Sequence, residues 1–258
     1  MSREFKTYHF ISSGTKDSLE AESLCVARYG QVKIEDADVI IALGGDGLML
    51  QTLRDFMNTG KPVYGMNRGS VGFLMNEFHV EELPERLSDA QLETIRPLRM
   101  RAKAASGGEV VAMAINEVSL FRQSYQAAKV QISIDDKVRL EELVCDGVML
   151  ATPAGSTAYN LSAQGPILPL EAPLLAMTAV SPYRPRRWGG ALLPKNVTVR
   201  FDILEADKRP VNAVADNKEV KSVLSVTIRE ARNSKINILF DKNHSWDERI
   251  LTEQFRHN

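Results

Sequence analysis

Residues 39–47 read Val39-Ile40-Ile41-Ala42-Leu43-Gly44-Gly45-Asp46-Gly47, an apolar run that ends in glycines around one aspartate. The length and β-branched content of the first five residues predict a buried strand. Apolar residues then recur at helical spacing from Leu48 to Phe56, which predicts a helix that starts directly after the glycines. The order strand, glycine turn, helix indicates a place where a ligand can approach backbone N–H groups.

The turn formed by Gly44, Gly45 and Gly47 suits a phosphate, because glycine allows positive φ and a helix start offers unpaired donors. Asp46 is an anion in this turn. Its carboxylate is therefore expected either to coordinate a cation that accompanies the phosphate or to accept a proton from an attacking hydroxyl. Both roles indicate phosphoryl transfer. Asp46 as a simple helix N-cap is the structural alternative, and the spacing matches neither a P-loop nor G-x-G-x-x-G.

Composition limits the partners of the chain. It has 258 residues, with 32 Lys and Arg against 33 Asp and Glu and a net charge of −1, so no global field favours nucleic acid or an anionic membrane. No segment reaches the roughly twenty apolar residues that span a bilayer, and the start of the chain lacks an apolar leader, which predicts a cytoplasmic protein. Cys25 and Cys145 have no metal-type spacing and are predicted to be free and buried.

Strands and helices alternate in the first part of the chain, as in a parallel sheet covered by helices. From about Pro97 the helical periodicity gives way to short apolar runs separated by turn residues. We therefore predict a Rossmann-like α/β domain over residues 1–96, a β-rich, sandwich-like domain over 97–240, and a C-terminal helix over 241–258 that packs on the first domain. The predicted strands are Lys6 to Ile11, Val39 to Leu43, Pro62 to Met66, Arg99 to Ala105, Glu109 to Ile115, Val118 to Phe121, Lys129 to Ile134, Val138 to Cys145, Val197 to Ile203, Val211 to Ala215 and Val220 to Ile228, and the predicted helices are Asp17 to Tyr29, Leu48 to Met57, Val80 to Ser88 and Trp246 to Phe255.

A second polar cluster, Asn116-Glu117, follows the apolar run Val110 to Ile115. An amide and a carboxylate together can donate to and accept from sugar hydroxyls or a base edge, which suits nucleoside recognition. A strand that simply ends in a turn is the structural alternative.

A third cluster extends from Asp146 to Ala163 and again orders strand, turn and helix. Ser156 or Thr157 is predicted to cap a helix that carries Tyr159 and Ser162. An aromatic ring and hydroxyl groups on one helical face could line a pocket, with the ring stacked on adenine and Asp146 accepting from its amino group. A capped helix with Tyr159 in the core is the alternative.

Together these clusters resemble the NAD kinase family, in the family's order: Leu43-Gly44-Gly45-Asp46-Gly47, Asn116-Glu117 and Thr152-Pro153-Ala154-Gly155-Ser156-Thr157-Ala158-Tyr159-Asn160-Leu161-Ser162. The segment Asn67-Arg68-Gly69-Ser70-Val71-Gly72-Phe73-Leu74 is similar to a further family motif. The glycine–aspartate motif alone also resembles those of phosphofructokinases and lipid kinases.

The resemblance implies transfer of a phosphoryl group from ATP or polyphosphate to the 2'-hydroxyl of the adenosine ribose of NAD, giving NADP. It implies that Asp46 is the base or orienting group and that a divalent ion such as Mg²⁺ travels with ATP, with no resident metal site in the protein. A homodimer or homotetramer in the cytoplasm is expected. The implied NAD-binding residues are Asp46, Gly47, Phe73, Asn116, Glu117, Asp146, Ala154, Thr157, Ala158, Tyr159 and Ser162, and the implied phosphate loop is Gly44, Gly45 and Gly47.

The chain departs from the family pattern at several positions. Leu48 replaces a small hydroxyl residue, Gln164-Gly165 stands where paired glycines are usual, and Asp216-Asn217-Lys218 replaces Asp-Gly-Gln. Two alternative functions therefore stand beside an NAD kinase: a lipid or sugar kinase that shares the glycine–aspartate loop, and a module that senses NAD or NADP without turnover. The basic run Arg184 to Trp188 is a solvated loop or contacts the dinucleotide of a neighbouring subunit.

Overall fold

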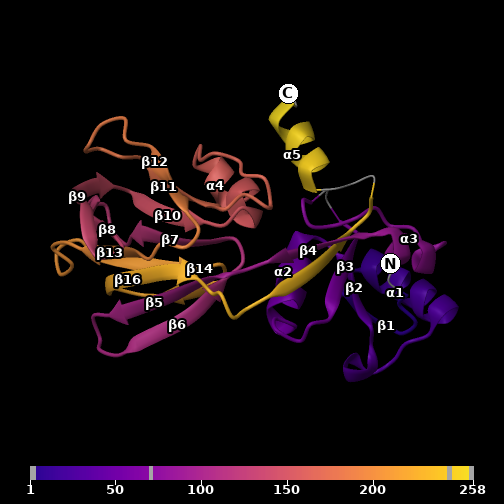
Figure 1. The fold of residues 1–258 in the computed structure, drawn as a ribbon. Helices are drawn as coiled ribbons and strands as arrows, with labels where there is room; N and C mark the ends of the chain where they lie inside the picture. The colour runs from indigo at the N-terminus through magenta and orange to yellow at the C-terminus, as the bar shows by residue number, and fades with distance from the viewer. Residues whose placement is uncertain (1–3, 70–71, 243–245, 256–258) are drawn as a thin grey trace. The chain divides into compact units, whose positions relative to one another are not determined.

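The computed structural model describes residues 4–69, 72–242 and 246–255, so Ser70 and Val71 of the predicted motif lie outside the described residues. The chain folds as two compact units. Unit 1 comprises Met1–Ile95 and Ser234–Asn258, and unit 2 comprises Arg96–Asn233. The fold is the predicted class, an α/β unit and a β-rich unit (Figure 1). The predicted domain end at residue 240 is wrong, because the strand over 236–240 pairs within the sheet of unit 1.

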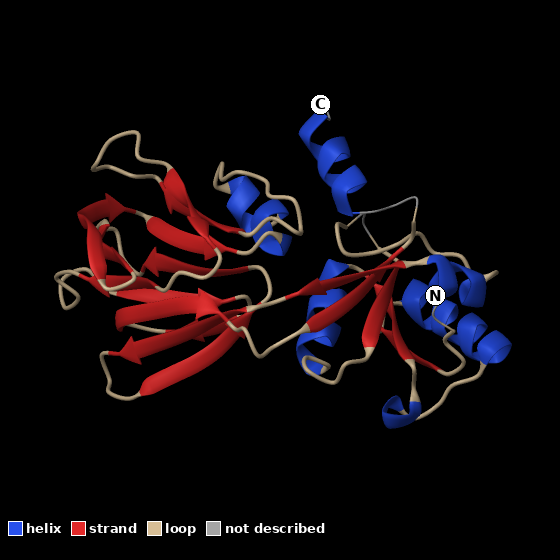
Figure 2. Cartoon of the chain, in the orientation of Figure 1, coloured by secondary structure: helices blue, strands red, loops and turns tan. Residues whose placement is uncertain are grey.

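The sheet of unit 1 has the order β1-β2-β3-β17-β4, with β4 antiparallel to β17 and the other pairs parallel. Helices flank this sheet (Figure 2). The strands are β1 (Tyr8–Ser12), β2 (Val39–Gly44), β3 (Pro62–Asn67), β4 (Gln91–Ile95) and β17 (Ile236–Phe240), and the helices are α1 (Lys16–Tyr29), η1 (Ile34–Asp36, 3₁₀), α2 (Asp46–Asp55), α3 (Leu83–Asp89) and α5 (Trp246–Phe255).

Both faces of β2 are buried, which explains why its sequence is continuously apolar. Residues such as Ile41 pack in one cluster with α1 and α3. On the opposite face, Gly65 of β3 gives room to α2 and the following chain, since a Cβ there would lie 3.1 Å from the sulfur of Met49 and 2.7 Å from that of Met75. The parallel sheet therefore presents the start of α2 at the carboxyl end of β2.

Two helix starts differ from the prediction by two residues or more. α3 begins at Leu83 because Glu82 has the left-handed conformation (φ 58°) and cannot continue a right-handed helix from Val80. α2 begins at Asp46, two residues before the predicted start at Leu48.

Unit 2 contains two six-stranded sheets, ordered β12-β11-β10-β7-β14-β15 and β6-β5-β16-β13-β8-β9. Fully buried side chains from both sheets, such as Leu120 and Val148 from one and Phe201 and Val226 from the other, form a single core. The strands are β5 (Leu98–Ala104), β6 (Glu109–Ala114), β7 (Glu117–Arg122), β8 (Ala128–Ile134), β9 (Lys137–Cys145), β10 (Gly147–Ala151), β11 (Leu174–Val180), β12 (Gly190–Pro194), β13 (Val199–Ile203), β14 (Val211–Ala215), β15 (Lys218–Val220) and β16 (Val223–Glu230), and the helices are η2 (Ala154–Thr157, 3₁₀) and α4 (Tyr159–Ser162).

The predicted strand Val220 to Ile228 is wrong in one respect. It is interrupted at Ser222, whose φ of 49° breaks extended backbone, so it forms the separate strands β15 and β16. β4, β11, β12 and β17 are strands that the sequence reading did not predict. Cys25 and Cys145 are free and buried, as predicted.

The first turn of α5 contacts the rest of unit 1. The ring of Trp246 lies 6.2 Å from that of Phe73 and 6.0 Å from that of Phe240.

Among the residues that the structure describes, no helix has the length and apolar character required to cross a bilayer.

Candidate functional site

Asp46 lies in the first turn of α2, directly after β2 and the extended residue Gly45 (φ −121°). Its carboxylate is half-buried and does not cap its own helix. Oδ2 accepts from the N–H of Phe73 at 2.8 Å, and Oδ1 accepts from the N–H of Leu74 at 3.0 Å. The interpretation of Asp46 as a simple N-cap is therefore wrong, because the carboxylate is held by a different segment of unit 1.

Gly72 explains why this segment can reach the carboxylate. A Cβ built at position 72 would lie 2.2 Å from Asp46 Oδ1, so any side chain there would displace one of the two groups. Gly69 of the same motif is different, since its nearest neighbour would be Asn67 Oδ1 at 4.0 Å. Only the second of these glycines is required by the close approach to Asp46.

The three glycines around Asp46 do not adopt the positive φ that the sequence reading expected. Gly44 is required by packing, because a Cβ there would lie 2.9 Å from Cδ2 of Leu48. A Cβ at Gly45 or Gly47 would meet no atom within 4 Å. The protein's own packing thus explains Gly44 and the apolar Leu48 beside it, whereas Gly45 and Gly47 leave the backbone at the helix start open to approach.

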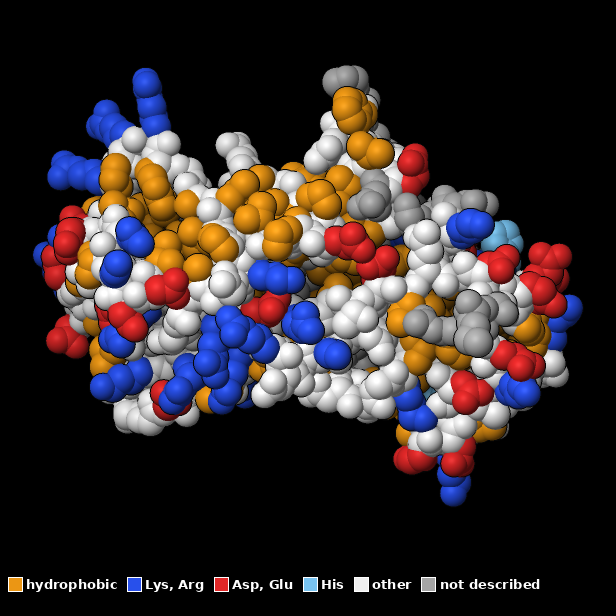
Figure 3. Space-filling model, viewed as in Figure 1, with side chains coloured by type: hydrophobic (Ala, Val, Ile, Leu, Met, Phe, Trp, Pro, Cys, Tyr) orange, Lys and Arg blue, Asp and Glu red, His pale blue; other side chains and the backbone are white. Residues whose placement is uncertain are grey.

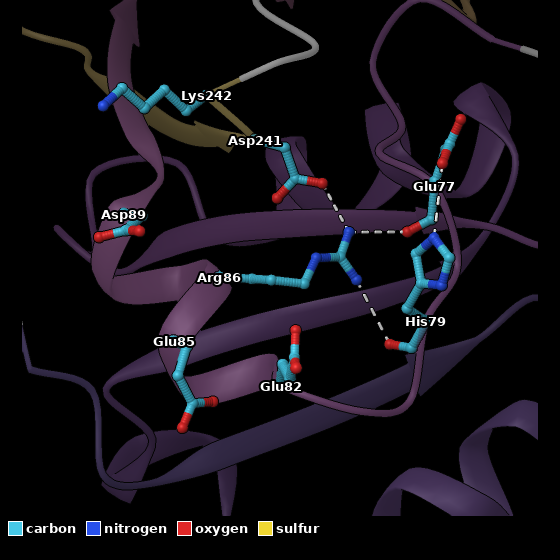
Figure 4. A pocket seen from close by; sticks show the side chains of 8 residues that line it. All are labelled: Glu77, His79, Glu82, Glu85, Arg86, Asp89, Asp241 and Lys242. Atoms are coloured by element: carbon cyan, nitrogen blue, oxygen red, sulfur yellow. Dashed lines mark hydrogen bonds and ion pairs between the residues drawn. The ribbon is translucent and has the colours of Figure 1, made fainter.

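A pocket of about 380 Å³ in unit 1 lies beside α3 (Figure 4). At its centre Arg86 donates to Asp241 at 2.5 Å and to the carbonyl oxygens of Glu77 and His79. Tyr64 donates to the other oxygen of Asp241 at 2.6 Å, and burial followed by the charge of Asp241 raises the pKa of this tyrosine. Arg86 thereby fixes residues 77–79, a few positions after the segment that holds Asp46.

In unit 2, Asp216 organises the predicted Asn116-Glu117 cluster. Its carboxylate accepts from the N–H groups of Ile115 at 2.7 Å, Asn116 at 3.0 Å and Glu117 at 3.3 Å. Asp216 precedes β15 with a φ of 49°, a turn conformation that Asp tolerates better than most residues. The sequence analysis assigned no role to Asp216, although an Asp in a hairpin turn is a signal for backbone capping.

Glu117 is a half-buried residue beside this second carboxylate. Burial, followed by the charge of Asp216, raises its pKa to about 7. Oε2 is buried without a hydrogen-bond partner among the described residues. Glu117 is therefore a carboxyl group that can exchange a proton near neutral pH.

Tyr159 is 40% exposed, so the interpretation of its ring as core is wrong. One ring neighbour is Phe121, stacked at a centroid distance of 5.6 Å and an interplanar angle of 28°. Phe121 in turn lies against Gly147, where a Cβ would be 2.7 Å from the ring. Glu117 and Phe121 share one face of β7 by strand alternation, which gathers Glu117, Phe121 and Tyr159 in one region.

Asp146 is engaged within unit 2. Its Oδ1 forms an ion pair with Nε of Arg122 at 2.6 Å and accepts from the hydroxyl of Tyr183 at 3.2 Å. Arg122 and Tyr183 are polar partners that the sequence reading missed.

The helix predicted over this third cluster is shorter than expected. Ser156 and Thr157 do not cap it, because α4 has Ala158 as its N-cap, without a side-chain hydrogen bond. Ser156 Oγ donates to Pro153 O at 2.6 Å and accepts from Leu168 N–H at 2.9 Å. Ala154 and Thr157 are only 4% and 8% exposed, so they offer little side-chain surface to a ligand.

Ser162 lines a pocket of about 430 Å³ in unit 2, together with Gln164 and Arg187. Gln164 and Arg187 both have positive φ, as does Ser181 in the same pocket. The pocket brings a predicted site residue together with one arginine of the basic run, and strained backbone of this kind is concentrated at functional sites.

A cluster of three or more His, Cys, Asp or Glu side chains able to hold a metal is absent from the described part of the chain. The carboxylates of Asp46 in unit 1 and Asp216 in unit 2 accept from backbone N–H groups, and Glu117 lies beside Asp216.

The sequence matches two family models in chain order. One, described as the ATP-NAD kinase N-terminal domain, matches residues 16–91, and one described as the ATP-NAD kinase C-terminal domain matches residues 115–229. The chain is 78% identical over 249 residues to an NAD kinase of Brucella suis, covering 96% of this chain and 97% of that one. It is 63% identical over 257 residues to an NAD kinase of Mesorhizobium japonicum, covering 100% of both.

Solved structures share the fold. Yeast NADH kinase complexed with NADH superposes with a TM-score of 0.84 at 23% identity, over 99% of this chain and 89% of that one. An NAD kinase from Archaeoglobus fulgidus in complex with ATP superposes with a TM-score of 0.76 at 21% identity, over 96% and 98%.

The relatives from Brucella suis and Mesorhizobium japonicum are both named NAD kinases. The matches therefore support neither a lipid or sugar kinase nor a non-catalytic sensor. Since both family models match in order and the curated relatives cover nearly all of its length, this chain belongs to the NAD kinase family and phosphorylates the 2'-hydroxyl of the adenosine ribose of NAD to give NADP.

Proposed function

We propose that Asp46 accepts the proton of the ribose 2'-hydroxyl during transfer. The hydroxyl oxygen forms a bond to the terminal phosphorus of the donor, the bond from that phosphorus to the leaving phosphate oxygen breaks, and the hydroxyl proton passes to Asp46 and then to solvent. The observation that carries this proposal is the bidentate hold on Asp46 by the N–H groups of Phe73 and Leu74.

The hold leaves Asp46 able to act. An ionised carboxylate has about four lone-pair sites, and the two N–H groups use one on each oxygen. The group is half-buried, and Gly45 and Gly47 beside it carry no side chain that would block an approaching phosphate. A fixed carboxylate requires no reorganisation when the hydroxyl arrives, which is how preorganised sites lower barriers.

NAD recognition is proposed for unit 2. Glu117 can accept from ribose hydroxyls, and the exposed ring of Tyr159 can stack on adenine. The yeast relative was solved with NADH, which supports a dinucleotide as ligand of this fold. The remaining residues proposed to bind NAD are Gly47 and Phe73 of unit 1 and Asn116, Asp146, Ala154, Thr157, Ala158 and Ser162 of unit 2.

ATP is the proposed donor, and the archaeal relative solved with ATP supports it. Mg²⁺ is proposed to arrive with the donor phosphates, because Mg²⁺ often keeps several waters and binds through one or two protein carboxylates together with substrate phosphates. Polyphosphate stays an alternative donor.

A homodimer or homotetramer in the cytoplasm is proposed, where the enzyme would serve NADP biosynthesis. Exposed hydrophobic side chains support an assembly of copies (Figure 3), since Val138, Tyr183 and Leu192 of unit 2 are 44–50% exposed and β12 is a sheet edge. Light scattering coupled to gel filtration measures the assembly, and fractionation of cells that produce the protein measures its location.

The test of the reaction is NADP formation by the purified protein with NAD, Mg²⁺ and either ATP or polyphosphate. We expect NADP to form with ATP, and we expect EDTA to abolish this formation. If NADP forms with polyphosphate alone, polyphosphate replaces ATP as the proposed donor.

The test of Asp46 is Asp46→Asn, which keeps the shape of the side chain and removes its basicity. A loss of kcat of about 10²- to 10⁴-fold is expected, with NAD still bound as measured by calorimetry. An Asp46→Asn enzyme that retains kcat within a few-fold would overturn the assigned role.

A further inference from the structure

One peptide unit of unit 1 contacts both Asp46 and the C-terminal helix. The N–H of Leu74 donates to Asp46 Oδ1 at 3.0 Å, and the carbonyl oxygen of Phe73, in the same planar peptide, accepts from Nη1 of Arg249 at 2.7 Å. Because the C=O and N–H of a trans peptide point in opposite directions, Arg249 and Asp46 engage opposite sides of one rigid group. The N–H of Phe73 completes the hold on Asp46 at 2.8 Å.

Arg249 is fixed by several partners. Nη2 donates to Asn76 Oδ1 at 3.3 Å, and the guanidinium carbon lies 5.3 Å from the ring centre of Phe240. Burial lowers the pKa of Arg249, an effect that the charges of Asp46 and Asp241 oppose. Removing a cation from water costs free energy unless the cation is well hydrogen-bonded. The hydrogen bond from Arg249 to the Phe73 carbonyl offsets part of this cost.

Trp246 adds a second link between α5 and the same segment. Its side chain is 3% exposed and its ring packs against those of Phe73 and Phe240. Residue 73 is therefore held from α5 both at its backbone, by Arg249, and at its side chain, by Trp246.

We propose that Arg249 is a positioning residue for phosphoryl transfer: it holds the Phe73–Leu74 peptide so that the peptide holds the Asp46 carboxylate. This rests on the role proposed for Asp46. The physical basis has two parts. A cation on the carbonyl oxygen polarises the peptide and strengthens the N–H as a donor, and the bond removes the freedom of the segment to rotate away. The carboxylate of Asp46 is thus oriented only when α5 packs on the rest of unit 1.

Arg86 provides a matched comparison. It is a partly buried guanidinium that donates to carbonyl oxygens of the same stretch, at Glu77 and His79. The peptide units that Arg86 contacts are not those that donate to Asp46, whose donors are the N–H groups of Phe73 and Leu74. Replacing Arg86 should lower stability without acting specifically through the carboxylate.

The experiment is a double-mutant cycle with wild-type enzyme, Arg249→Met, Asp46→Asn and the double variant. Arg249→Met should lower kcat about 10- to 100-fold, the loss expected for a misplaced catalytic group, with KM for NAD changed less than about threefold. In the Asp46→Asn background the same replacement should change kcat less than about threefold, because the group it positions is already disabled. Arg249→Lys keeps a cationic donor for the Phe73 carbonyl and should recover most of kcat.

Three results would overturn the proposal: unchanged kcat in Arg249→Met, an equal loss of kcat in both backgrounds, or no recovery by Arg249→Lys. Circular dichroism establishes that each variant is folded. Arg249→Gln enters the same cycle, with the same expected non-additivity, if Arg249→Met does not fold. Arg86→Met is expected to change kcat by the same factor in both backgrounds. Failure of the role proposed for Asp46 is distinguished from failure of the role proposed for Arg249, because in the first case the Asp46→Asn single variant retains its activity.

Discussion

Each of the two units contains a candidate site residue with a carboxyl group, and the hydrogen bonding of the two carboxyl groups differs. In unit 1, Asp46 accepts from two backbone N–H groups at 2.8 and 3.0 Å. In unit 2, Oε2 of Glu117 is buried without a hydrogen-bond partner among the described residues, while the neighbouring Asp216 accepts from the backbone N–H groups. The environment of the group, rather than its chemical type, decides what it can do.

This difference separates orientation from protonation. The N–H donors of unit 1 fix the direction of a carboxylate, as a step that needs alignment requires. In unit 2, burial and the charge of Asp216 raise the pKa of Glu117 to about 7, which makes its protonation state sensitive to pH and to a ligand that donates hydrogen bonds. A mutation that disturbs orientation should therefore act on kcat, and one that alters Glu117 should act on the pH dependence.

Among the tests of this comparison, Gly72→Ala gives the largest expected effect, because it directly disturbs the orientation of the Asp46 carboxylate. The added Cβ would lie 2.2 Å from Asp46 Oδ1, so either the carboxylate or the 72–74 backbone has to move. We expect kcat to fall about 10- to 100-fold while NAD still binds. Steady-state kinetics of NADP formation measures the change.

Gly69→Ala is the control for this prediction. The Cβ it adds would have its nearest neighbour at 4.0 Å, although it lies in the same glycine-containing motif. It should retain kcat within about threefold, in keeping with the small effects of uncrowded substitutions. Equal losses of kcat in the two variants would show that the approach to Asp46 is not the cause.

Glu117→Gln tests the other half of the comparison. A carboxyl group whose pKa rises on folding from 4.5 to about 7 keeps its proton in the native state while the unfolded chain loses it. Stability is therefore lost as the pH rises from about 4.5 to 7 and stays reduced above pH 7. The full shift corresponds to about 3 kcal/mol, and residual solvent access reduces the expected effect to about 1–2 kcal/mol.

Glutamine has no proton to lose in this range. Glu117→Gln should therefore be more stable than wild type at pH 8 and gain little at pH 5, as measured by urea unfolding at both values. Asp207→Asn, which changes an exposed carboxylate of the same unit, should show no such difference. A Glu117→Gln protein with the same gain at both pH values would contradict the raised pKa.

The sequence predicted the parts of the fold whose signals are local. The run Val39 to Leu43 is apolar because both sheet faces cover it, and β2 follows from this pattern alone. Asp46 could be identified because strand, glycines and helix are contiguous. By contrast, β17 is a five-residue strand whose place beside β3 depends on a chain return from unit 2, and no local pattern encodes that pairing.

The environment of the site was less predictable for the same reason. Asp216 reaches Asn116 across about a hundred residues, and Arg249 reaches Phe73 across 176. The sequence identifies Asn116 and Phe73 as candidates but contains no short-range signal for their partners. The roles of the glycines also depend on long-range contacts, since Gly44 is required by its neighbours rather than by φ and Gly72 by the close approach of Asp46.

Tyr159→Ala has the smallest expected effect and sharpens the comparison on the side of recognition. The ring is 40% exposed and stacked on Phe121 on one side, so its loss should remove a stacking surface without opening the core. We expect KM for NAD to rise about 5- to 30-fold, the equivalent of about 1–2 kcal/mol of stacking, with kcat little changed. Tyr159→Phe keeps the ring and should retain the wild-type KM, and Tyr125→Ala, which removes an 88% exposed ring of the same unit, should also be neutral. If Tyr159→Ala lowers kcat while KM stays constant, the ring serves orientation, and the division of labour between the two units would have to be abandoned.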